Sequence, residues 1–290
     1  MEETLDVVFY RPCGSVIASA AARLHMTPNQ LTAFGAAVGI IGGHFLFYRS
    51  VTLNLMGIAL ILAAEMIDSA DGQLARMTNQ FTKYGRFLDG FGDNLKFVSI
   101  YVHCALRFSA AVGMVPAFAV ALIAGVSHSY QSAAADYYRT AFLGFALKKS
   151  RKDLKTTAEL STNNAQLTWR RHPLEKLFLR LWLNNTYQQE MMSRSFILLN
   201  TEASNRWNGT LPDSFSAEYY ERNLPLIKYY NILTTNTRMA VLFVAVLADV
   251  IPLYFAFEIV VLNLLLAAVL LRQSAINRTL HEKIIDGVYT

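Results

Sequence analysis

Charged residues and cysteines are both scarce in this sequence. Charged residues make up 16% of it, against roughly 25% in soluble domains, while hydrophobic residues make up 53%. One water-soluble surface cannot cover so much apolar side chain, which excludes a disordered chain, a coiled coil and a nucleic-acid module. The two cysteines, Cys13 and Cys104, are far apart and give neither a disulfide framework nor a metal motif. The net charge of +5 suits the basic cytoplasmic loops of a membrane protein, so we expect no nucleic-acid partner.

Long apolar stretches dominate what is present. Six of them approach the length of about 20 residues that a helix needs to cross a bilayer. They are residues 31–48, 53–77, 87–107, 112–137, 235–250 and 252–271. None alternates with a period of two, so helices rather than strands are expected. The sequence therefore predicts an all-α integral membrane protein with six transmembrane helices.

The regions next to these spans are less regular. Residues 15–23 suit a short N-terminal interfacial helix or a plain buried one, and Pro12 and Gly14 are expected to break the chain before it. The acidic start of the sequence is wrong for a cleaved signal peptide. Asp249 and Pro252 mark the predicted turn between spans five and six.

Basic residues are unevenly distributed along the chain. Between residues 141 and 228 lie 13 of the 26 Lys and Arg residues. Positive residues mark cytoplasmic loops, so this segment and, with six spans, both termini are expected in the cytoplasm. We expect an integral protein of the bacterial inner (cytoplasmic) membrane. It would form one membrane-embedded domain over residues 1–290 with a cytoplasmic helical insertion at 147–228, between spans four and five.

Four aspartates lie in otherwise apolar sequence, namely Asp68, Asp71, Asp89 and Asp93. An aspartate at the centre of a membrane helix costs about 2.5–3.5 kcal/mol on insertion scales, so four near one depth need a reason. Spacings of three and four residues place each pair on one helix face, and a helical hairpin would bring all four together. Carboxylates so close would repel one another, and a divalent cation relieves this. Oxygen ligands favour Mg²⁺, Mn²⁺ or Ca²⁺.

Small and basic residues accompany the aspartates. Gly72 and Gly85 let a ligand approach the backbone, and Arg76 suits a phosphate. Any one of these residues taken alone could belong to a loop at the membrane surface. All eight positions at this spacing, however, match a known pattern. They resemble, without a departure, the signature of the CDP-alcohol phosphotransferase (CDP-alcohol phosphatidyltransferase) family: Asp68-x2-Asp71-Gly72-x2-Ala75-Arg76-x8-Gly85-x3-Asp89-x3-Asp93. Residues 26–32 also resemble a segment common in that family.

The resemblance implies a transferase of phospholipid biosynthesis. Members of the family have six transmembrane helices and move a substituted phosphate from a CDP-linked donor to an alcohol, releasing CMP. One or two divalent cations, Mg²⁺ or Mn²⁺, are implied at Asp68, Asp71 and Asp89. Asp93 completes this carboxylate set and is implied as the general base for the acceptor hydroxyl. The implied nucleotide site consists of Gly72, Ala75, Arg76 and Gly85.

The substrates stay open at this point. The lipid can belong to the donor, as in CDP-diacylglycerol, or to the acceptor of a CDP-linked headgroup. The segment 147–228 departs from compact family members. It is expected to lie on the membrane near the metal site and to shape the acceptor entrance, because basic and aromatic residues alternate there with apolar ones. The alternative is a regulatory or dimer-contact appendage, and a homodimer is among the expected assemblies.

Three further charged residues are candidates for acceptor binding. Asp136 and Arg139 lie one turn apart near the end of span four, where they face a cavity or pair with each other. Arg238 opens span five and is expected either to contact a phosphate or to anchor the helix at the interface.

Two rival functions remain. An intramembrane prenyltransferase also binds a diphosphate through Asp-rich motifs, but it carries two of them, and Asp249 and Glu258 are isolated in the second half of this chain. A cation carrier with intramembrane carboxylates would not need glycine and arginine at these spacings. The product distinguishes the three functions: a phosphotransferase releases CMP, a prenyltransferase releases pyrophosphate, and a carrier releases neither.

Overall fold

The computed structural model describes residues 3–81, 85–149, 154, 156–168, 170, 173–207 and 210–289. Over these residues every regular element is helical, which confirms the all-α class. In chain order the elements are η1 (Asp6–Tyr10), α1 (Arg11–Arg23), α2 (Pro28–Phe45), α3 (Val51–Thr78), α4 (Gly85–Val112), α5 (Met114–Phe145), α6 (Thr157–Gln166), α7 (Pro173–Met192), α8 (Arg194–Trp207), α9 (Asp213–Ile232), α10 (Thr235–Leu247), α11 (Ile251–Ala256), η2 (Phe257–Val261) and α12 (Leu262–Ile285).

The chain divides into two compact units. The motif unit consists of Glu2–Val126 and Met239–Phe257, and the second unit of Ser127–Arg238 and Glu258–Thr290. Helix α5 begins in the motif unit and ends in the second unit. The expected single domain with an insertion at 147–228 stays a prediction.

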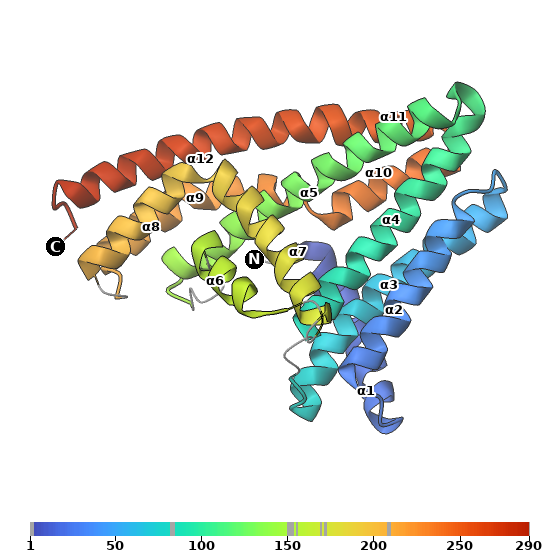
Figure 1. Cartoon of the computed structure of the whole chain (residues 1–290), viewed down its shortest axis with the longest axis horizontal. Coiled ribbons are helices and arrows are strands. Elements are labelled where there is room, and N and C mark those ends of the chain that lie inside the picture. Colours follow the sequence, from blue (N-terminus) through green and yellow to red (C-terminus); the bar gives the residue numbers. More distant parts are fainter. Residues whose placement is uncertain are drawn as a thin grey trace. The chain divides into compact units, whose positions relative to one another are not determined.

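Helices α2, α3 and α4 form the centre of the motif unit, and α1 packs against α3 (Figure 1). The approach of α2 to α3 is close because glycines face each other. A Cβ atom on Gly42 would lie 2.9 Å from the carbonyl oxygen of Gly57, and one on Gly57 would lie 2.8 Å from that of Gly42. Small residues that let two backbones approach are typical of helix packing in membranes.

Local sequence explains where α2 begins. The side chain of Thr27 accepts a hydrogen bond from the backbone N–H of Gln30, and the side chain of Gln30 accepts one from the backbone N–H of Thr27. Pro28 occupies the first turn, where its missing N–H costs nothing. This capping box fixes the start of the helix that carries one wall of the site.

The expected break at Pro12 and Gly14 is wrong. Helix α1 contains both residues and follows directly from η1, a π-helical turn. The register shift in such a turn accommodates a proline that cannot donate. Gly14 is a packing position instead, since a Cβ atom there would lie 2.9 Å from side-chain atoms of Ser69 and Gln73 on α3. The small residues Ala18 and Ala21 bury the same face of α1 against α3.

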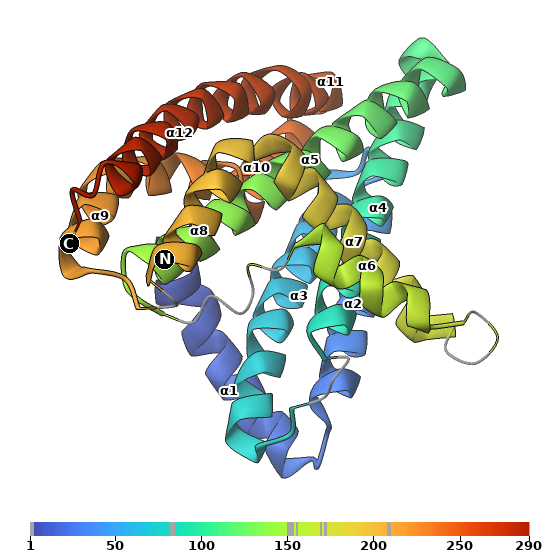
Figure 2. The same ribbon diagram turned by 60° about the vertical axis from the view of Figure 1, so that its left-hand side comes forward.

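Aromatic side chains form the core of the second unit. The ring of Phe145 on α5 lies 5.3 Å from that of Phe196 on α8 and 5.3 Å from that of Tyr219 on α9. Phe215 also contacts Phe145, and all four side chains are buried. Helix α12 runs along α8 and α9 (Figure 2). Residues from the segment 147–228 therefore build the core of this unit.

Four helical stretches among the described residues are long and apolar enough to cross a membrane. They are Val51–Thr78, Gly90–Val112, Asp213–Leu247 and Ile251–Ile285. They overlap the second, third, fifth and sixth predicted spans, and the third of them begins inside the predicted insertion. The first and fourth predicted spans fall on α2 and α5, which are not among the four. The count of six spans is therefore not confirmed.

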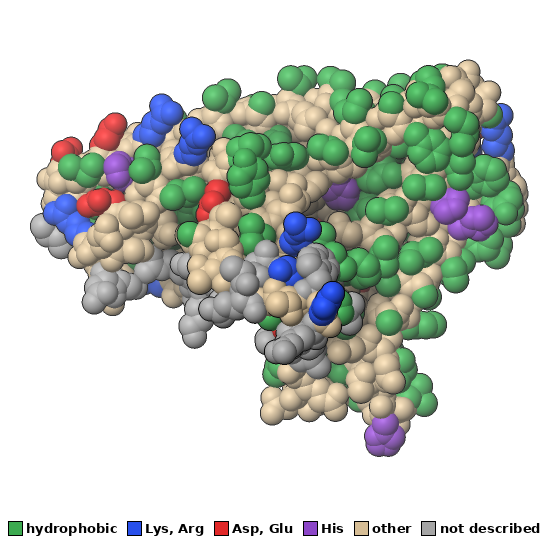
Figure 3. Space-filling view, in the orientation of Figure 1, with side chains coloured by type: hydrophobic (Ala, Val, Ile, Leu, Met, Phe, Trp, Pro, Cys, Tyr) green, Lys and Arg blue, Asp and Glu red, His purple; other side chains and the backbone are tan. Residues whose placement is uncertain are grey.

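The surface of the protein also agrees with a membrane location. Large apolar side chains are exposed on the surface (Figure 3), among them Val115, Leu122 and Leu271 at 82%, 69% and 74%. The predicted turn between the last two spans is confirmed: α10 ends at Leu247, Asp249 has a φ of 56°, and Pro252 lies in the first turn of α11.

Candidate active site

A small polar pocket lies in the motif unit between α2, α3 and α4. Asp68 of α3 and Asp93 of α4 both line it, so two of the four motif aspartates share one space. The other lining residues are Thr32, Gly35, Ala36, Ala64, Gly92 and Lys96. Half of the lining residues are glycine or alanine, which leave room that longer side chains would fill.

Asp71 lies one turn further along α3 and is buried. Its Oδ2 accepts a hydrogen bond of 2.5 Å from the hydroxyl of Thr32, which itself lines the pocket. The third motif aspartate is thus connected to the pocket through a residue of α2. The side chain of Asp89 lies outside the described part of the chain, so the expected convergence of all four carboxylates stays a prediction.

An ion-pair cluster that the sequence analysis missed adjoins the pocket. Lys96 is buried, and its Nζ donates to Oε1 of Glu65 on α3 and, at 2.7 Å, to Oδ1 of Asp93. Glu65 precedes Asp68 by three residues and Lys96 follows Asp93 by three, so each shares a helix face with a motif aspartate. These three-residue spacings are the sequence signal that could have assigned Glu65 and Lys96 to the site. We call Glu65, Asp93 and Lys96 the lysine cluster.

Tyr10 lies close enough to the lysine cluster for the charge of Glu65 to affect the pKa of its hydroxyl. Tyr10 in η1 is buried, and burial raises the pKa of its hydroxyl to about 12, with a smaller contribution from the negative charge of Glu65. Tyr10 therefore stays neutral at physiological pH and adds no charge near Glu65.

The expected nucleotide-binding residues lie along the last turns of α3 and the start of α4. Arg76 is exposed, and its guanidinium lies 3.7 Å from where a Cβ atom on Gly72 would stand. Ala75 is partly buried, and Gly85 is the first residue of α4. Arg76 and Gly72 therefore lie side by side on one face of α3, and the nucleotide-binding role of these residues stays a prediction.

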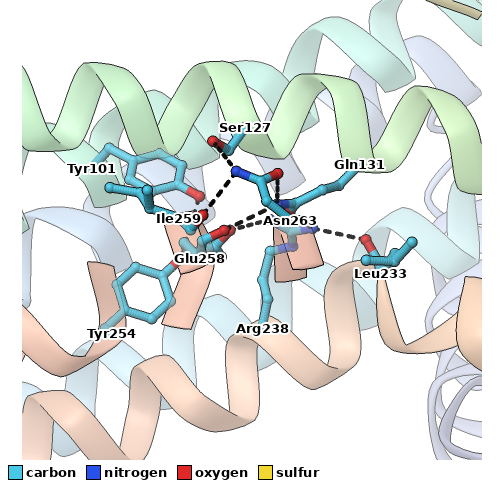
Figure 4. Close-up of polar contacts among 9 residues, drawn as sticks. All are labelled: Tyr101, Ser127, Gln131, Leu233, Arg238, Tyr254, Glu258, Ile259 and Asn263. Carbon is cyan, nitrogen blue, oxygen red and sulfur yellow. Dashed lines mark hydrogen bonds and ion pairs between the residues drawn. The ribbon is translucent and has the colours of Figure 1, made fainter. Parts of the chain in front are cut away.

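The candidate acceptor residue Arg238 is fully buried in the second unit. Its Nη1 donates to Oε2 of Glu258 at 2.6 Å, and its Nη2 donates to Oε1 of Gln131 at 3.1 Å and to the Leu233 carbonyl oxygen at 2.7 Å (Figure 4). Gln131 in turn donates to Oδ1 of Asn263 at 2.8 Å. We call these residues the sealed network. This internal ion pair is an arrangement that neither expectation for Arg238 included.

The other two acceptor candidates lie on the part of α5 that belongs to the second unit. Asp136 is exposed and Arg139 is partly buried. Their expected role in acceptor binding stays a prediction.

Asp68 and Asp93 give the pocket carboxylate oxygens, which are the ligands that a hard divalent cation prefers, and the ammonium of Lys96 lines the pocket beside them. Among the side chains that the structure describes, no group of three acids, histidines or cysteines is close enough to hold a metal ion. Asp89, the remaining motif aspartate, would have to complete such a set. The expectation that Asp68, Asp71, Asp89 and Asp93 hold the cation stays a prediction.

These features define a helical, membrane-type protein with a carboxylate-lined pocket between three closely packed helices. Comparison with known proteins gives the class a family. Residues 25–158 match the family model of CDP-alcohol phosphatidyltransferases, which confirms the resemblance. The matched segment contains the whole Asp68–Asp93 motif and the pocket. Members of the family generally use a divalent metal.

Relatives with sequence similarity cover part of the chain. An uncharacterized protein of Aquifex aeolicus is 31% identical over 134 residues, which is 45% of this chain and 66% of the relative. Archaetidylinositol phosphate synthase of Pyrococcus horikoshii is 37% identical over 31% of this chain and 46% of its own. CDP-diacylglycerol–serine O-phosphatidyltransferase of Helicobacter pylori is 32% identical over 26% of this chain and 30% of its own. This chain thus spans less than two thirds of each relative, and no solved structure matches it.

Proposed function

We propose that the protein is a membrane phosphotransferase of lipid biosynthesis. It moves a substituted phosphate group from a CDP-linked donor to an acceptor hydroxyl and releases CMP. The observation that carries this proposal is the shared pocket of Asp68 and Asp93, within a segment that matches the family model of CDP-alcohol phosphatidyltransferases. Phosphoryl transfer depends mainly on positioning and electrostatics, which rigid, glycine-packed helices can supply.

The proposed roles follow the motif. Asp68, Asp71 and Asp89 would hold one or two divalent cations, which when bound neutralise the diphosphate of the donor. Asp93 accepts the proton of the acceptor hydroxyl as general base. The proposed contacts to the cytidine nucleotide are Gly72, Ala75, Arg76 and Gly85, with the Arg76 guanidinium on a phosphate oxygen.

The proposed topology has six spans, with α2 and α5 completing the four stretches identified by length and hydropathy. The concentration of basic residues between 141 and 228 supports a cytoplasmic location for that segment and for both termini. The end of α3 and the start of α4, and therefore the pocket, then face the cytoplasm. We propose the bacterial inner membrane as the location. No finding supports the expected homodimer.

The names of the relatives suggest which donor to try first. The H. pylori relative is named for CDP-diacylglycerol and serine, and the P. horikoshii relative for an archaetidylinositol phosphate product. CDP-diacylglycerol is therefore the first donor to test here, with serine and inositol phosphate as first acceptors.

The test is a matrix of donors and acceptors with the purified protein in nanodiscs, read by CMP release. CDP-diacylglycerol, CDP-choline, CDP-ethanolamine and CDP-inositol serve as donors. CMP release that depends on one donor and one acceptor supports the proposal. Pyrophosphate release from a prenyl diphosphate would indicate the prenyltransferase, and cation flux without either product would indicate the carrier.

A further inference from the structure

Lys96 places its ammonium between two carboxylates of different exposure. The Nζ atom donates to Glu65 and to Oδ1 of Asp93. The Lys96 side chain is 4% exposed and that of Glu65 is 14% exposed, whereas that of Asp93 is 46% exposed and lines the pocket. One carboxylate balances the charge of the ammonium, but its remaining N–H groups also need acceptors when they are buried. Asp93 supplies one of these acceptors and at the same time faces the pocket.

The path of the lysine side chain is built by a third helix. A Cβ atom on Gly39 of α2 would lie 3.0 Å from both Cγ and Cδ of Lys96. The stem thus passes from α4 across a glycine of α2 to reach Glu65 on α3. Three helices cooperate to fix the position of one ammonium group.

We infer that Lys96 is a positioning residue for Asp93: Glu65 anchors the ammonium, which holds Oδ1 of Asp93 and leaves the other carboxylate oxygen to accept a proton. This inference rests on the proposed function, in which Asp93 is the general base. A carboxylate with one oxygen held in an ion pair keeps lone pairs on the second oxygen in a defined direction.

The step that Lys96 serves is the attack on the donor. The O–H bond of the acceptor breaks and its proton moves to Asp93. The acceptor oxygen bonds to the phosphorus that carries the transferred group, and the bond from that phosphorus to the CMP oxygen breaks with its electron pair leaving on CMP. Because a misplacement of about 1 Å can cost about 10²-fold in rate, loss of the Lys96 contact should lower kcat about 10- to 100-fold.

The experiment separates positioning from simple charge neutralisation. Lys96→Met leaves Glu65 without its ammonium, whereas Lys96→Met/Glu65→Met removes both buried charges together. Lys283→Met is the matched control, because Lys283 donates to Glu218 at 2.7 Å in the second unit, outside the pocket. Each protein is measured for melting temperature, CMP binding, and kcat and KM for the donor.

We expect the double variant to melt near the wild-type temperature and to keep CMP affinity and donor KM within about twofold, with kcat 10- to 100-fold lower. Lys283→Met should keep the wild-type kcat. A double variant with wild-type kcat, or with a raised donor KM and unchanged kcat, overturns the inference. If it does not fold, Lys96→Met/Glu65→Gln provides the same comparison. If the wild-type protein releases no CMP with any donor, the proposed function is wrong and the inference is wrong with it. If the double variant has the wild-type kcat, only the role of Lys96 is overturned.

Discussion

The lysine cluster of the motif unit and the sealed network of the second unit treat a buried cation differently. Both side chains of the Arg238–Glu258 pair are 0% exposed, and the remaining contacts of the guanidinium are to Gln131 and to a backbone carbonyl. Lys96 is nearly as buried, but one of its two partners, Asp93, is 46% exposed and lines a pocket. A sealed pair can only hold helices together, whereas an open one can also meet a ligand.

This difference indicates which charged residues in apolar helices mark a functional site. Both clusters satisfy the rule that a charge in a membrane segment needs a partner. Only the lysine cluster combines such a partner with small wall residues that leave space. Intramembrane charge alone is thus a weak indicator of a site, and charge beside a pocket is a stronger one.

Chelation should have the largest effect and should act on only one of the two regions. EDTA is expected to abolish CMP release, and Mg²⁺ or Mn²⁺ to restore it, because the motif offers hard carboxylate ligands. The sealed network contains a single carboxylate, that of Glu258, which is paired with Arg238, so chelation should change the stability of the second unit little. Full CMP release after thorough chelation would contradict the metal assignment.

Removing the proposed base is the next largest effect. Asp93→Asn should lower kcat by about 10²–10⁴-fold, since an amide cannot accept the proton, while CMP binding is retained. Asp213→Asn is the matched control, because Asp213 forms an exposed ion pair with Lys148 in the second unit and does not line the pocket. Near wild-type turnover in Asp93→Asn would assign the base to another group.

Breaking the sealed pair should affect stability rather than rate. Arg238→Met leaves Glu258 buried without its guanidinium, which should cost about 3–5 kcal/mol of unfolding free energy. Arg238→Met/Glu258→Met should recover most of that loss. The measurement is thermal unfolding in detergent together with acceptor KM. If Arg238→Met keeps its stability and loses acceptor affinity, Arg238 is the ligand contact that its place in the sequence suggested.

The sequence predicts the helices from their periodicity, and it predicts the meeting of Asp68 with Asp93 because a hairpin of two consecutive helices brings them together. It does not predict the lysine cluster, since the path of Lys96 depends on Gly39, a residue of a third helix. It likewise treats Arg238 and Glu258 as isolated, because a turn between two helices separates them and η2 brings Glu258 into place. Both omissions are contacts between elements, and the break expected at Gly14 fails for the same reason: packing on α3 outweighs local propensity.

The smallest expected effect comes from a substitution that changes no charged residue, Gly39→Ala. Gly39→Ala puts a methyl group 3.0 Å from the stem of Lys96 and 3.3 Å from Cβ of Ala64, so the stem must shift by a few tenths of an ångström. Ion-pair partners persist, but the ammonium moves relative to Asp93. We expect kcat to fall by less than about tenfold, which is less than the loss for Lys96→Met, with donor KM unchanged.

Gly125→Ala is the control for this substitution, because nothing lies within 4 Å of a Cβ atom built on Gly125. It should leave kcat at the wild-type value and, through the better helix propensity of alanine, keep or slightly raise stability. Steady-state CMP release and thermal unfolding measure both variants. Equal kcat values for Gly39→Ala and Gly125→Ala would show that the position of the Lys96 stem does not matter for turnover. The lysine cluster would then resemble the sealed network, a device that holds helices together and no more.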